Sequence, residues 1–393
     1  MVETLLKELG VKPLINAAAT QTPLGGSRMN PSVSRAMDEA SRYFLDLRQL
    51  HRAVGGRIAR LTNNEDAMVS GGVASAFYLV TMALLSLNDP QAFALLPQQQ
   101  PSEHSMVIYQ THCVEYTIGI EQAGVRLRRI DEQGTVDADA GLLETELARE
   151  KPLAVFYVLA GPWIKPGAPP LETVIQVCQR HGVPVIVDAA AQLPPKSNFW
   201  RFTQMGADLA LFSGGKDLRG PSHIGLVLGR HDLVEACRSL ISPNEGVGRF
   251  FKIGKEELLA ALVAVEDYMV QDEAARLSWC EKEVEKLVRE LSDVKCIEAT
   301  RAYPNEAGQP LPRVFVRLLK TAGMKDAREI CEDFLHRETP IAFLADSAKG
   351  GFYINPMTLA PGESEKILLE IQDYFNRNQS PMCLGKTERM IGP

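Results

Sequence analysis

The sequence lacks the features that mark membrane, secreted and zinc-binding proteins. No apolar run reaches the roughly 20 residues that a membrane span requires, and the first ten residues lack the basic start and apolar stretch of a secretion signal. The seven cysteines are scattered, odd in number and never spaced as CxxC, and the seven histidines form no HExxH motif. These absences predict a cytoplasmic protein with reduced thiols, no membrane partner and no metal site.

The chain also lacks an excess of positive charge. Lysine and arginine number 42 against 49 acidic residues, so the formal net charge is −7. Nucleic acids and anionic membranes are bound by basic surfaces, and this balance therefore predicts no nucleic-acid partner. The chain has 393 residues, 45% of them hydrophobic, and this length and composition are enough for two or three domains with cores of their own. The sequence contains no repeat or low-complexity tract.

Short apolar strands alternate with helices between about residues 60 and 230. The expected strands are 67–70, 106–109, 154–158, 183–187, 207–212 and 224–228. Continuous apolar strands between helices predict an α/β fold with a mostly parallel sheet covered on both faces. A long surface loop is expected at 88–105. After Lys255 amphipathic helices and the alternating strand 313–318 predict a small α+β domain.

A lysine and an aspartate follow two of these strands. Asp188 ends the apolar run 184–188, and Lys216 follows strand 207–212 after Ser213 and two glycines. Pyridoxal phosphate chemistry needs an amine for a Schiff base and a carboxylate that keeps the pyridine nitrogen protonated. The 28-residue spacing leaves room for one connection and one strand, so both residues can lie at neighbouring strand ends. A helix N-cap at Asp188 and an ordinary loop lysine are the simpler alternatives.

A glycine turn and a histidine complete the pattern. The turn between strand 67–70 and a buried helix offers backbone N–H groups and a helix dipole to the cofactor phosphate, although a plain tight turn has the same composition. Its residues are Ser70, Gly71, Gly72, Val73, Ala74 and Ser75. His112, just after strand 106–109, is a candidate for stacking on the pyridine ring and moving a proton, although an isolated histidine is more often structural.

Three further residues are candidates for contacts with the cofactor. Ala190, within Ala189-Ala190-Ala191, keeps a wall flat enough for a ring to lie against it. Gln192 is placed to reach the phenolic oxygen of the cofactor, and Ser213 is placed to bond its phosphate. The set of four sites is far more specific than any single member, and it predicts pyridoxal 5'-phosphate as the cofactor.

These residues resemble a known family, the fold type I pyridoxal phosphate enzymes of the selenocysteine synthase-like and D-glucosaminate-6-phosphate ammonia-lyase-like branch. The resemblance covers roughly residues 13 to 375. It is carried by the segments 15–17, 24–29, 44–62, 70–75, 187–195, 213–221, 248–249, 252–257 and 355–359. It implies that Lys216 forms the Schiff base, that Asp188 faces the pyridine nitrogen and that His112 stacks on the ring. The sequence differs from the family pattern at Cys113, Thr117 and 222–223, which flank the substrate cavity. The resemblance therefore does not determine the identity of the substrate.

The resemblance also implies an organisation. Residues 1–45 are expected to form an N-terminal arm that contributes to the small domain or to a partner's site. Residues 46–250 are expected to form the large cofactor-binding domain around a seven-stranded sheet, and 251–393 the small C-terminal α+β domain. Members of the family are homodimers or larger homo-oligomers with shared active sites, so the arm around 25–28 and the region near Arg48 are expected to reach a partner.

The expected reaction begins at Cα of an amino acid or amino sugar acid. Lys216 is placed to remove the Cα proton, and the protonated ring spreads the charge of the carbanion. Elimination of a β-substituent by an ammonia-lyase is the first choice, an amino-acid racemase or epimerase the second, and β-replacement or transamination the third. The alternative outside the enzymes is an assembly scaffold whose site has lost its activity. Candidates for binding the substrate carboxylate are, in falling order, Arg219, Arg249 and Arg313. Gly26 and Ser27 are further candidates for contacts with the substrate.

Overall fold

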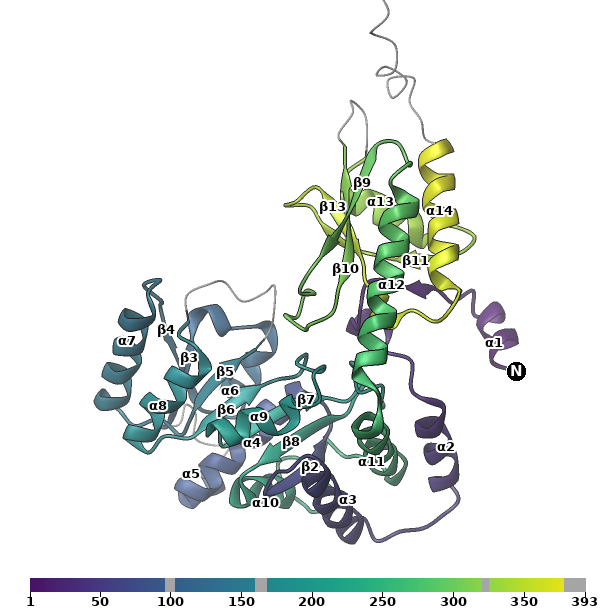
Figure 1. Ribbon diagram of the computed structural model, residues 1–393. Coiled ribbons are helices and arrows are strands. Elements are labelled where there is room, and N and C mark those ends of the chain that lie inside the picture. Colours follow the sequence, from purple (N-terminus) through teal and green to yellow (C-terminus); the bar gives the residue numbers. More distant parts are fainter. Residues whose placement is uncertain (96–102, 160–167, 320–324, 378–393) are drawn as a thin grey trace, which may run out of the picture. The chain divides into compact units, whose positions relative to one another are not determined.

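The computed structural model describes residues 1–95, 103–159, 168–319 and 325–377 (Figure 1). The chain divides into two compact units. The larger unit consists of residues 27–271 with 306–309, and the smaller unit consists of residues 1–26, 272–305 and those from 310 onward.

A seven-stranded sheet forms the centre of the larger unit, in the order β2-β8-β7-β6-β5-β3-β4. β8 alone runs in the direction opposite to the other strands of this sheet. The strands are β2 (Asp66–Ser70), β3 (Ser105–Tyr109), β4 (Arg126–Ile130), β5 (Val155–Val158), β6 (Val185–Asp188), β7 (Leu209–Ser213) and β8 (Gly225–Gly229). The predicted α/β class and mostly parallel sheet are confirmed.

One strand of this sheet was not predicted from the sequence. β4 reads Arg-Leu-Arg-Arg-Ile, and its three arginines hide the strand pattern. β4 lies at the sheet edge, and its arginines pair with acidic side chains nearby: Arg126 with Glu150 at 2.8 Å, Arg128 with Glu146 at 3.0 Å and Arg129 with Glu121 at 3.1 Å. Charged side chains are a common feature of edge strands.

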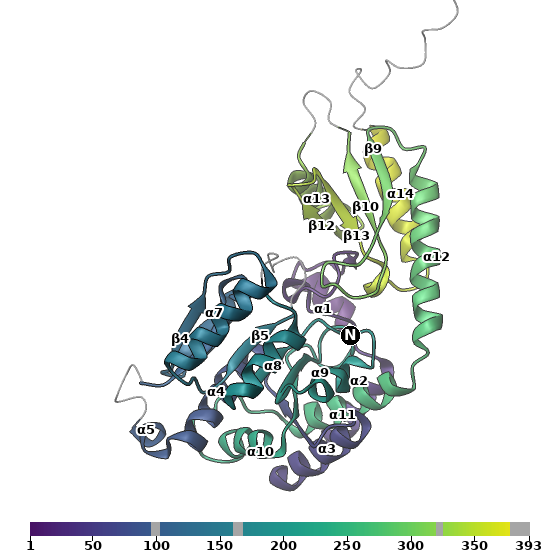
Figure 2. The same ribbon diagram turned by 60° about the vertical axis from the view of Figure 1, so that its left-hand side comes forward.

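Helices cover both faces of the sheet (Figures 1 and 2). They are α2 (Pro31–Ala40), α3 (Leu47–Leu61), α4 (Val73–Asn88), α5 (Pro90–Leu95), α6 (Ile118–Gln122), α7 (Val136–Arg149), α8 (Leu171–His181), α9 (Asn198–Met205), α10 (His231–Leu240) and α11 (Lys255–Val270). Successive residues of β6 join different cores, because Ile186 packs with α4 and α10 while Val187 packs with α8 and α11. In the described part of the chain no helix is both long enough and apolar enough to span a membrane.

The segment 88–105 was expected to be a loop, but α5 lies within it at Pro90–Leu95. A proline is favourable in the first turn of a helix because the missing N–H has no intrahelical partner there. The three glutamines at 98–100, which also favoured a loop, lie outside the described residues.

The unit boundary differs from the predicted domain limits at 45/46 and 250/251. Helix α11 packs against α2 and α3, with Arg57 Nε 3.0 Å from Glu266 Oε1 and with Ser32 donating to Asp267. These contacts tie residues 27–45 and 251–271 to the sheet, so the division falls after Gly26 and after Gln271 instead.

The smaller unit has a four-stranded antiparallel sheet in the order β12-β13-β10-β9. Its strands are β9 (Ile297–Ala302), β10 (Arg313–Leu318), β12 (Leu344–Asp346) and β13 (Gly351–Ile354); β1 (Ile15–Asn16) and β11 (Ile341–Ala342) form a separate parallel pair. The helices are α1 (Val2–Glu8), α12 (Glu273–Leu291), α13 (Ala327–Leu335) and α14 (Glu363–Arg377). The predicted small α+β architecture is therefore present.

The thiols only partly follow the expectation of a fully reduced protein. Free thiols are present at Cys113, Cys178, Cys237, Cys280 and Cys331. Cys296 is disulfide-bonded, so the expectation does not hold for this residue.

Candidate active site

Asp188 and Lys216 lie at the same edge of the large sheet, the edge at which its parallel strands end. Asp188 is the last residue of β6 and pairs in register with Leu211 of the neighbouring strand β7. Lys216 follows the end of β7 by three residues. Parallel strands present their carboxyl ends at one edge, where ligands of α/β sheets bind. The carboxyl group of Asp188 is buried and Lys216 is half-buried, so the pair is largely removed from water.

The carboxylate of Asp188 is held by two donors. The backbone N–H of Ala190 donates to Oδ1 at 2.9 Å, and the hydroxyl of Tyr116 donates to Oδ2 at 3.3 Å. Burial raises the pKa of Asp188, while the Ala190 N–H, the charge of Lys216 and the Tyr116 hydroxyl partly offset this rise. A cation beside this carboxylate would restore its charged form, which is the arrangement that a pyridinium N–H requires.

Burial lowers the pKa of Lys216, and the negative charges of Asp188 and Glu306 oppose that shift. A lysine with reduced proton affinity offers a neutral amine for a larger fraction of the time, which favours its use as a nucleophile or base. Glu306 belongs to the short segment 306–309. The side-chain amide of Gln192 donates to Ala307 O at 3.0 Å and to Leu159 O at 2.6 Å, which fastens this segment beside the strand ends.

The two glycines before Lys216 are required by close packing. A Cβ atom on Gly214 would lie 2.2 Å from Cγ1 of Ile224, and one on Gly215 would lie 2.4 Å from Cα of Ser222. Gly214 N also donates to Ile224 O at 2.9 Å. The chain therefore turns tightly back against the start of β8, and this turn fixes the position of the lysine.

The glycine turn lies at the same sheet edge. Ser70 ends β2 and Ser213 ends β7, and both pair in register with Gly225, the first residue of β8 between them. Gly72 has φ +100° and is the N-cap residue of α4, which begins at Val73. Gly72 has no side chain with which to cap the helix, so the N–H groups of the first turn are available to an anion.

His112 is buried at the end of a short 3-10 helix, Gln110–His112. Its Nδ1 accepts from the backbone N–H of Val158 at 3.5 Å, and Val158 pairs in register with Asp188. The rings of His112 and Tyr157 meet edge to face with centroids 4.4 Å apart. Burial lowers the pKa of His112 to about 4, against a weaker opposing effect of Glu132, so the imidazole is neutral near pH 7.

The low pKa of His112 predicts a pH-dependent stability. The unfolded chain binds a proton at this residue below about pH 6.5, whereas the folded chain does so only near pH 4. The free energy of unfolding of the native protein should therefore fall, relative to His112→Gln, by on the order of 3 kcal/mol between pH 7 and pH 4. Urea unfolding of both proteins at several pH values measures this difference. A difference that does not change with pH would contradict the low pKa.

The remaining predicted site residues lie in three places. Ser27 donates to Gly215 O from its N–H at 3.0 Å and from its hydroxyl at 3.1 Å, and Arg219 Nε donates to Arg28 O at 3.0 Å. Residues 27–28 therefore contact the lysine turn of their own chain. Arg249 is exposed and donates to Ser242 Oγ at 2.7 Å. Arg313 lies in the smaller unit with its guanidinium 3.6 Å from the centre of the Tyr353 ring.

Gly26 is the last residue of the first segment of the smaller unit and precedes Ser27 in the chain. Ala190 is half-buried, and its carbonyl accepts from Ser213 N at 3.4 Å, so Ala190 and Ser213 lie side by side at the ends of β6 and β7. The amide nitrogen of Gln192 is bound to two backbone carbonyls, so in this conformation it serves to hold the 306–309 segment.

Sequence reasoning did not select Tyr116 and Glu306. Tyr116 follows the histidine of the predicted set by four residues, and this proximity was the one available signal. Glu306 follows Lys216 by 90 residues, in a segment without strand or helix periodicity, and nothing in the sequence connects the two. Both depend on tertiary structure.

Substitution of Tyr116 by phenylalanine removes one of the two donors to Asp188. We expect the affinity for pyridoxal phosphate to fall about three- to tenfold, because a hydrogen bond to a charged group contributes about 1.5 kcal/mol or more and water can replace part of it. Titration of the cofactor into apoprotein, followed by absorbance, measures the change. Tyr374→Phe is the matched control, since its hydroxyl donates at 2.7 Å to Asp333 in the smaller unit. Equal affinities in the wild type and Tyr116→Phe would contradict the assigned contact.

Comparisons with known proteins agree with this fold. Residues 63–250 match the Aminotransferase class-V family model. The fold is that of the fold type I enzymes, and the class-V match with the similarity to D-glucosaminate-6-phosphate ammonia-lyase confirms the predicted cofactor, pyridoxal phosphate, and the predicted enzyme class. A solved structure of SPT with PLP has a TM-score of 0.59 and 15% identity, with 93% of this chain and 88% of that chain covered, and it supports the fold alone.

Two relatives are similar over nearly the whole chain. The 5'-C-glycyluridine monooxygenase-decarboxylase of a Streptomyces species is 29% identical over 374 residues, which are 94% of this chain and 91% of that protein. D-glucosaminate-6-phosphate ammonia lyase of Salmonella typhimurium is 27% identical over 380 residues, which are 95% and 98%. A solved structure of D-glucosaminate-6-phosphate ammonia-lyase has a TM-score of 0.78 and 26% identity, covering 95% of this chain and 99% of that chain.

The residues present fit the cofactor. Asp188 offers a buried carboxylate to a ring N–H, Lys216 offers an amine of lowered pKa to an aldehyde, and the uncapped start of α4 offers N–H groups to a phosphate. All three positions lie at one edge of one sheet.

Proposed function

We propose that this chain is an ammonia-lyase that acts by α,β-elimination on a hydroxy amino acid or an amino sugar acid. The observation that carries the proposal is the placement of Lys216, an amine of lowered pKa, at the same strand ends as the buried carboxylate of Asp188, whose charge acts on it. The similarity to an ammonia lyase over 95% of the chain supports elimination as the reaction.

Each residue has a role in this proposal. When bound, pyridoxal phosphate supplies an electron sink for the charge that develops at Cα of the substrate. Asp188 holds the proton on the ring nitrogen and so keeps that sink effective. Lys216 removes the proton from Cα, and the same amine, now protonated, is placed to donate a proton to the departing β-hydroxyl. Water then enters, and the products are ammonia and a 2-oxo acid.

The second candidate is oxidative decarboxylation. The Streptomyces relative is named for monooxygenation with decarboxylation and is similar over 94% of this chain. On this chain that reaction would use the same cofactor-binding residues, but it would consume dioxygen and release carbon dioxide. Racemisation and transamination also begin at Cα, so the four reactions share the site and diverge in their later steps.

One experiment separates these reactions. The cofactor-loaded enzyme is incubated in deuterated water with D-glucosaminate, its 6-phosphate, and D- and L-serine, with and without oxygen. Elimination predicts equal amounts of ammonia and 2-oxo acid that do not depend on oxygen or on an added keto acid. Oxygen-dependent carbon dioxide would favour decarboxylation. Deuterium at Cα with inverted configuration and no 2-oxo acid would favour a racemase, and either result would overturn the lyase proposal.

We further propose that the substrate carboxylate binds beside Ser27 and Arg219. The hydroxyl of Ser27 donates to Gly215 O, next to Lys216. Arg219, three residues after Lys216, donates to Arg28 O, so these residues lie close to the lysine. A guanidinium suits a carboxylate because it donates two parallel hydrogen bonds. Arg249 is a weaker candidate because it contacts Ser242 and no residue of the lysine turn in the described hydrogen bonds.

We also propose a cytoplasmic homo-oligomer. Three consecutive hydrophobic side chains are exposed at Tyr43, Phe44 and Leu45, and Phe44 is 106% exposed. Adjacent exposed apolar side chains of this size favour burial against another protein surface. Light scattering is expected to give at least twice the chain mass of 43.3 kDa, and Phe44→Ser should shift the protein toward the monomer. A monomeric wild type at micromolar concentration would contradict this proposal.

A further inference from the structure

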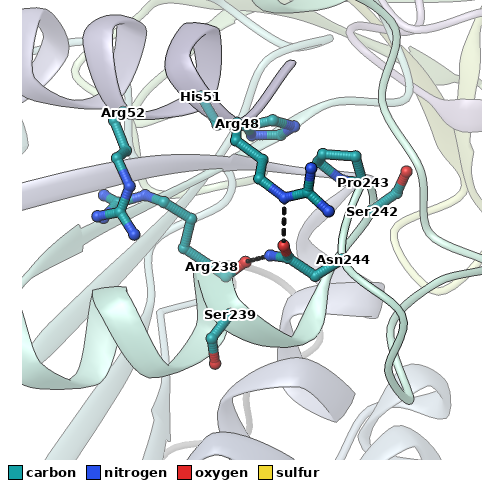
Figure 3. Close-up of a pocket in the computed structure, with 8 residues that line it drawn as sticks. All are labelled: Arg48, His51, Arg52, Arg238, Ser239, Ser242, Pro243 and Asn244. Carbon is teal, nitrogen blue, oxygen red and sulfur yellow. Dashed lines mark hydrogen bonds between the residues drawn. The ribbon is translucent and has the colours of Figure 1, made fainter. Parts of the chain in front are cut away.

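A cavity of the larger unit lies between α3, the last turn of α10 and the residues that follow it (Figure 3). Its volume is about 370 Å³, near the lower limit of small-molecule sites. It is lined by Arg48, His51, Arg52, Arg238, Ser239, Ser242, Pro243 and Asn244. This lining includes no carboxylate and shares no residue with the strand-end site of Asp188 and Lys216.

Arg48 contributes a guanidinium that is oriented but not neutralised. Its Nε donates to Asn244 Oδ1 at 3.1 Å, and Asn244 Nδ2 donates to Arg238 O at 3.2 Å. The neutral amide thus fixes the side chain and leaves its charge intact. In Figure 3 the terminal nitrogens of Arg48 point away from Arg238, toward Pro243 and Ser242.

His51 lines the same cavity and is 3% exposed. Neither of its ring nitrogens has a hydrogen-bond partner in the described part of the chain. Buried polar groups are normally paired, so an imidazole without a partner beside a cavity indicates a missing ligand. Burial and the charge of Arg238 lower the pKa of His51 to about 4, which keeps one ring nitrogen as a donor and the other as an acceptor.

The charges around the cavity leave an excess of positive charge. Arg52 and Arg238 both pair with Glu235, and Arg238 also donates to Asp66 Oδ1 at 2.8 Å. These two carboxylates balance these two arginines, and Arg48 adds a further cation. The hydroxyl of Ser242 accepts from Arg249 at 2.7 Å, which leaves its own hydrogen to donate elsewhere and places another guanidinium at this serine.

We propose that this cavity is an oxyanion site for a phosphate group, separate from the site of the cofactor phosphate. Arg48 supplies two N–H donors, and Ser242 and His51 supply one donor each. A tetrahedral dianion with several acceptor oxygens fits a donor set of this number and charge. The phosphate is either inorganic phosphate or the phosphate of a small organic ester, and the test distinguishes the two.

The test is isothermal titration of the holoenzyme with inorganic phosphate and, separately, with glycerol 3-phosphate in a phosphate-free buffer. The holoenzyme is used because bound pyridoxal phosphate fills the other phosphate site, and glycerol 3-phosphate has no amine that reacts with the cofactor. The wild type is expected to bind one phosphate group per chain. The readout is independent of turnover, so failure of the lyase proposal leaves it unaffected.

Two variants test the assigned residues. Arg48→Gln removes the charge, and Asn244→Asp keeps the acceptor for Arg48 while it adds a repelling charge; each is expected to weaken binding at least tenfold. Arg57→Gln is the control, because Arg57 lies on the same helix, is paired with Glu266 and does not line the cavity, and its affinity should stay within about twofold of the wild type. Circular dichroism checks that each variant is folded.

Two outcomes support the site and identify the source of the phosphate. Equal affinities for the two probes indicate inorganic phosphate, and a glycerol 3-phosphate affinity at least tenfold higher indicates an organic ester. Absence of saturable binding to the wild type would overturn the proposal. Wild-type affinity in folded Arg48→Gln or Asn244→Asp would overturn it as well.

Discussion

Lys216→Ala is expected to reduce turnover by at least about 10³-fold, because one side chain supplies both the covalent link to the cofactor and the base at Cα. The amine lies at the end of β7, with its pKa lowered by burial, beside Asp188. A methyl group cannot form an imine or accept a proton. Steady-state ammonia release and the visible absorbance of the purified variant measure the two losses together.

A matched control separates the loss of this amine from a general loss of positive charge. Lys282 is an exposed lysine on α12, and Lys282→Ala should retain full turnover and the absorbance of the wild type. Partial rescue of Lys216→Ala by methylamine would further support a role in proton transfer. Wild-type turnover in folded Lys216→Ala would contradict the assigned role.

Asp188→Asn is expected to lower turnover by about 10²- to 10⁴-fold while the fold is retained. The asparagine keeps the size of the side chain and an acceptor for the Ala190 N–H, but it loses the negative charge that holds a proton on the ring nitrogen. The cofactor then remains attached through Lys216 while its capacity to accept electrons falls. We therefore expect kcat to fall while the wavelength of the bound cofactor band shows that the covalent link is still present.

Asp208→Asn is the control for this substitution. Asp208 precedes β7 at the opposite edge of the sheet, where it accepts from Val185 N at 2.8 Å and from Arg230. Its replacement should lower the free energy of unfolding by about 1 to 3 kcal/mol and leave kcat within about twofold. If Asp208→Asn lost as much turnover as Asp188→Asn, the effect at Asp188 would be one of stability and not of charge.

The strand ends could be predicted from the sequence because local pattern determines them. An apolar run that stops at an aspartate, and another that stops before Ser-Gly-Gly-Lys, place Asp188 and Lys216 at strand ends without any long-range information. The sheet order then brings the two ends together. Strand β4 was missed because arginines occupy three of its five positions, and their partners Glu121, Glu146 and Glu150 lie on α6, on α7 and directly after α7.

Contacts between distant segments could not be predicted. The charge of Glu306 opposes the lowering of the Lys216 pKa only because the segment 306–309 returns to the strand ends, where Gln192 holds it. Arg313 and Arg249 matched the chemistry of a carboxylate ligand, but one lies on a strand of the smaller unit and the other contacts Ser242. The sequence predicts three arginines in falling order of preference, Arg219, Arg249 and Arg313, and the tertiary structure shows where each of them lies.

The central claim is that Lys216 carries the cofactor covalently beside the carboxylate of Asp188. The most direct measurement is reduction of the holoenzyme with borohydride, followed by proteolysis and mass mapping of the peptides. A pyridoxyl adduct on the peptide that contains Lys216, and on no other lysine peptide, is the predicted result. An unmodified Lys216 peptide, or an adduct on a different lysine, would contradict the account.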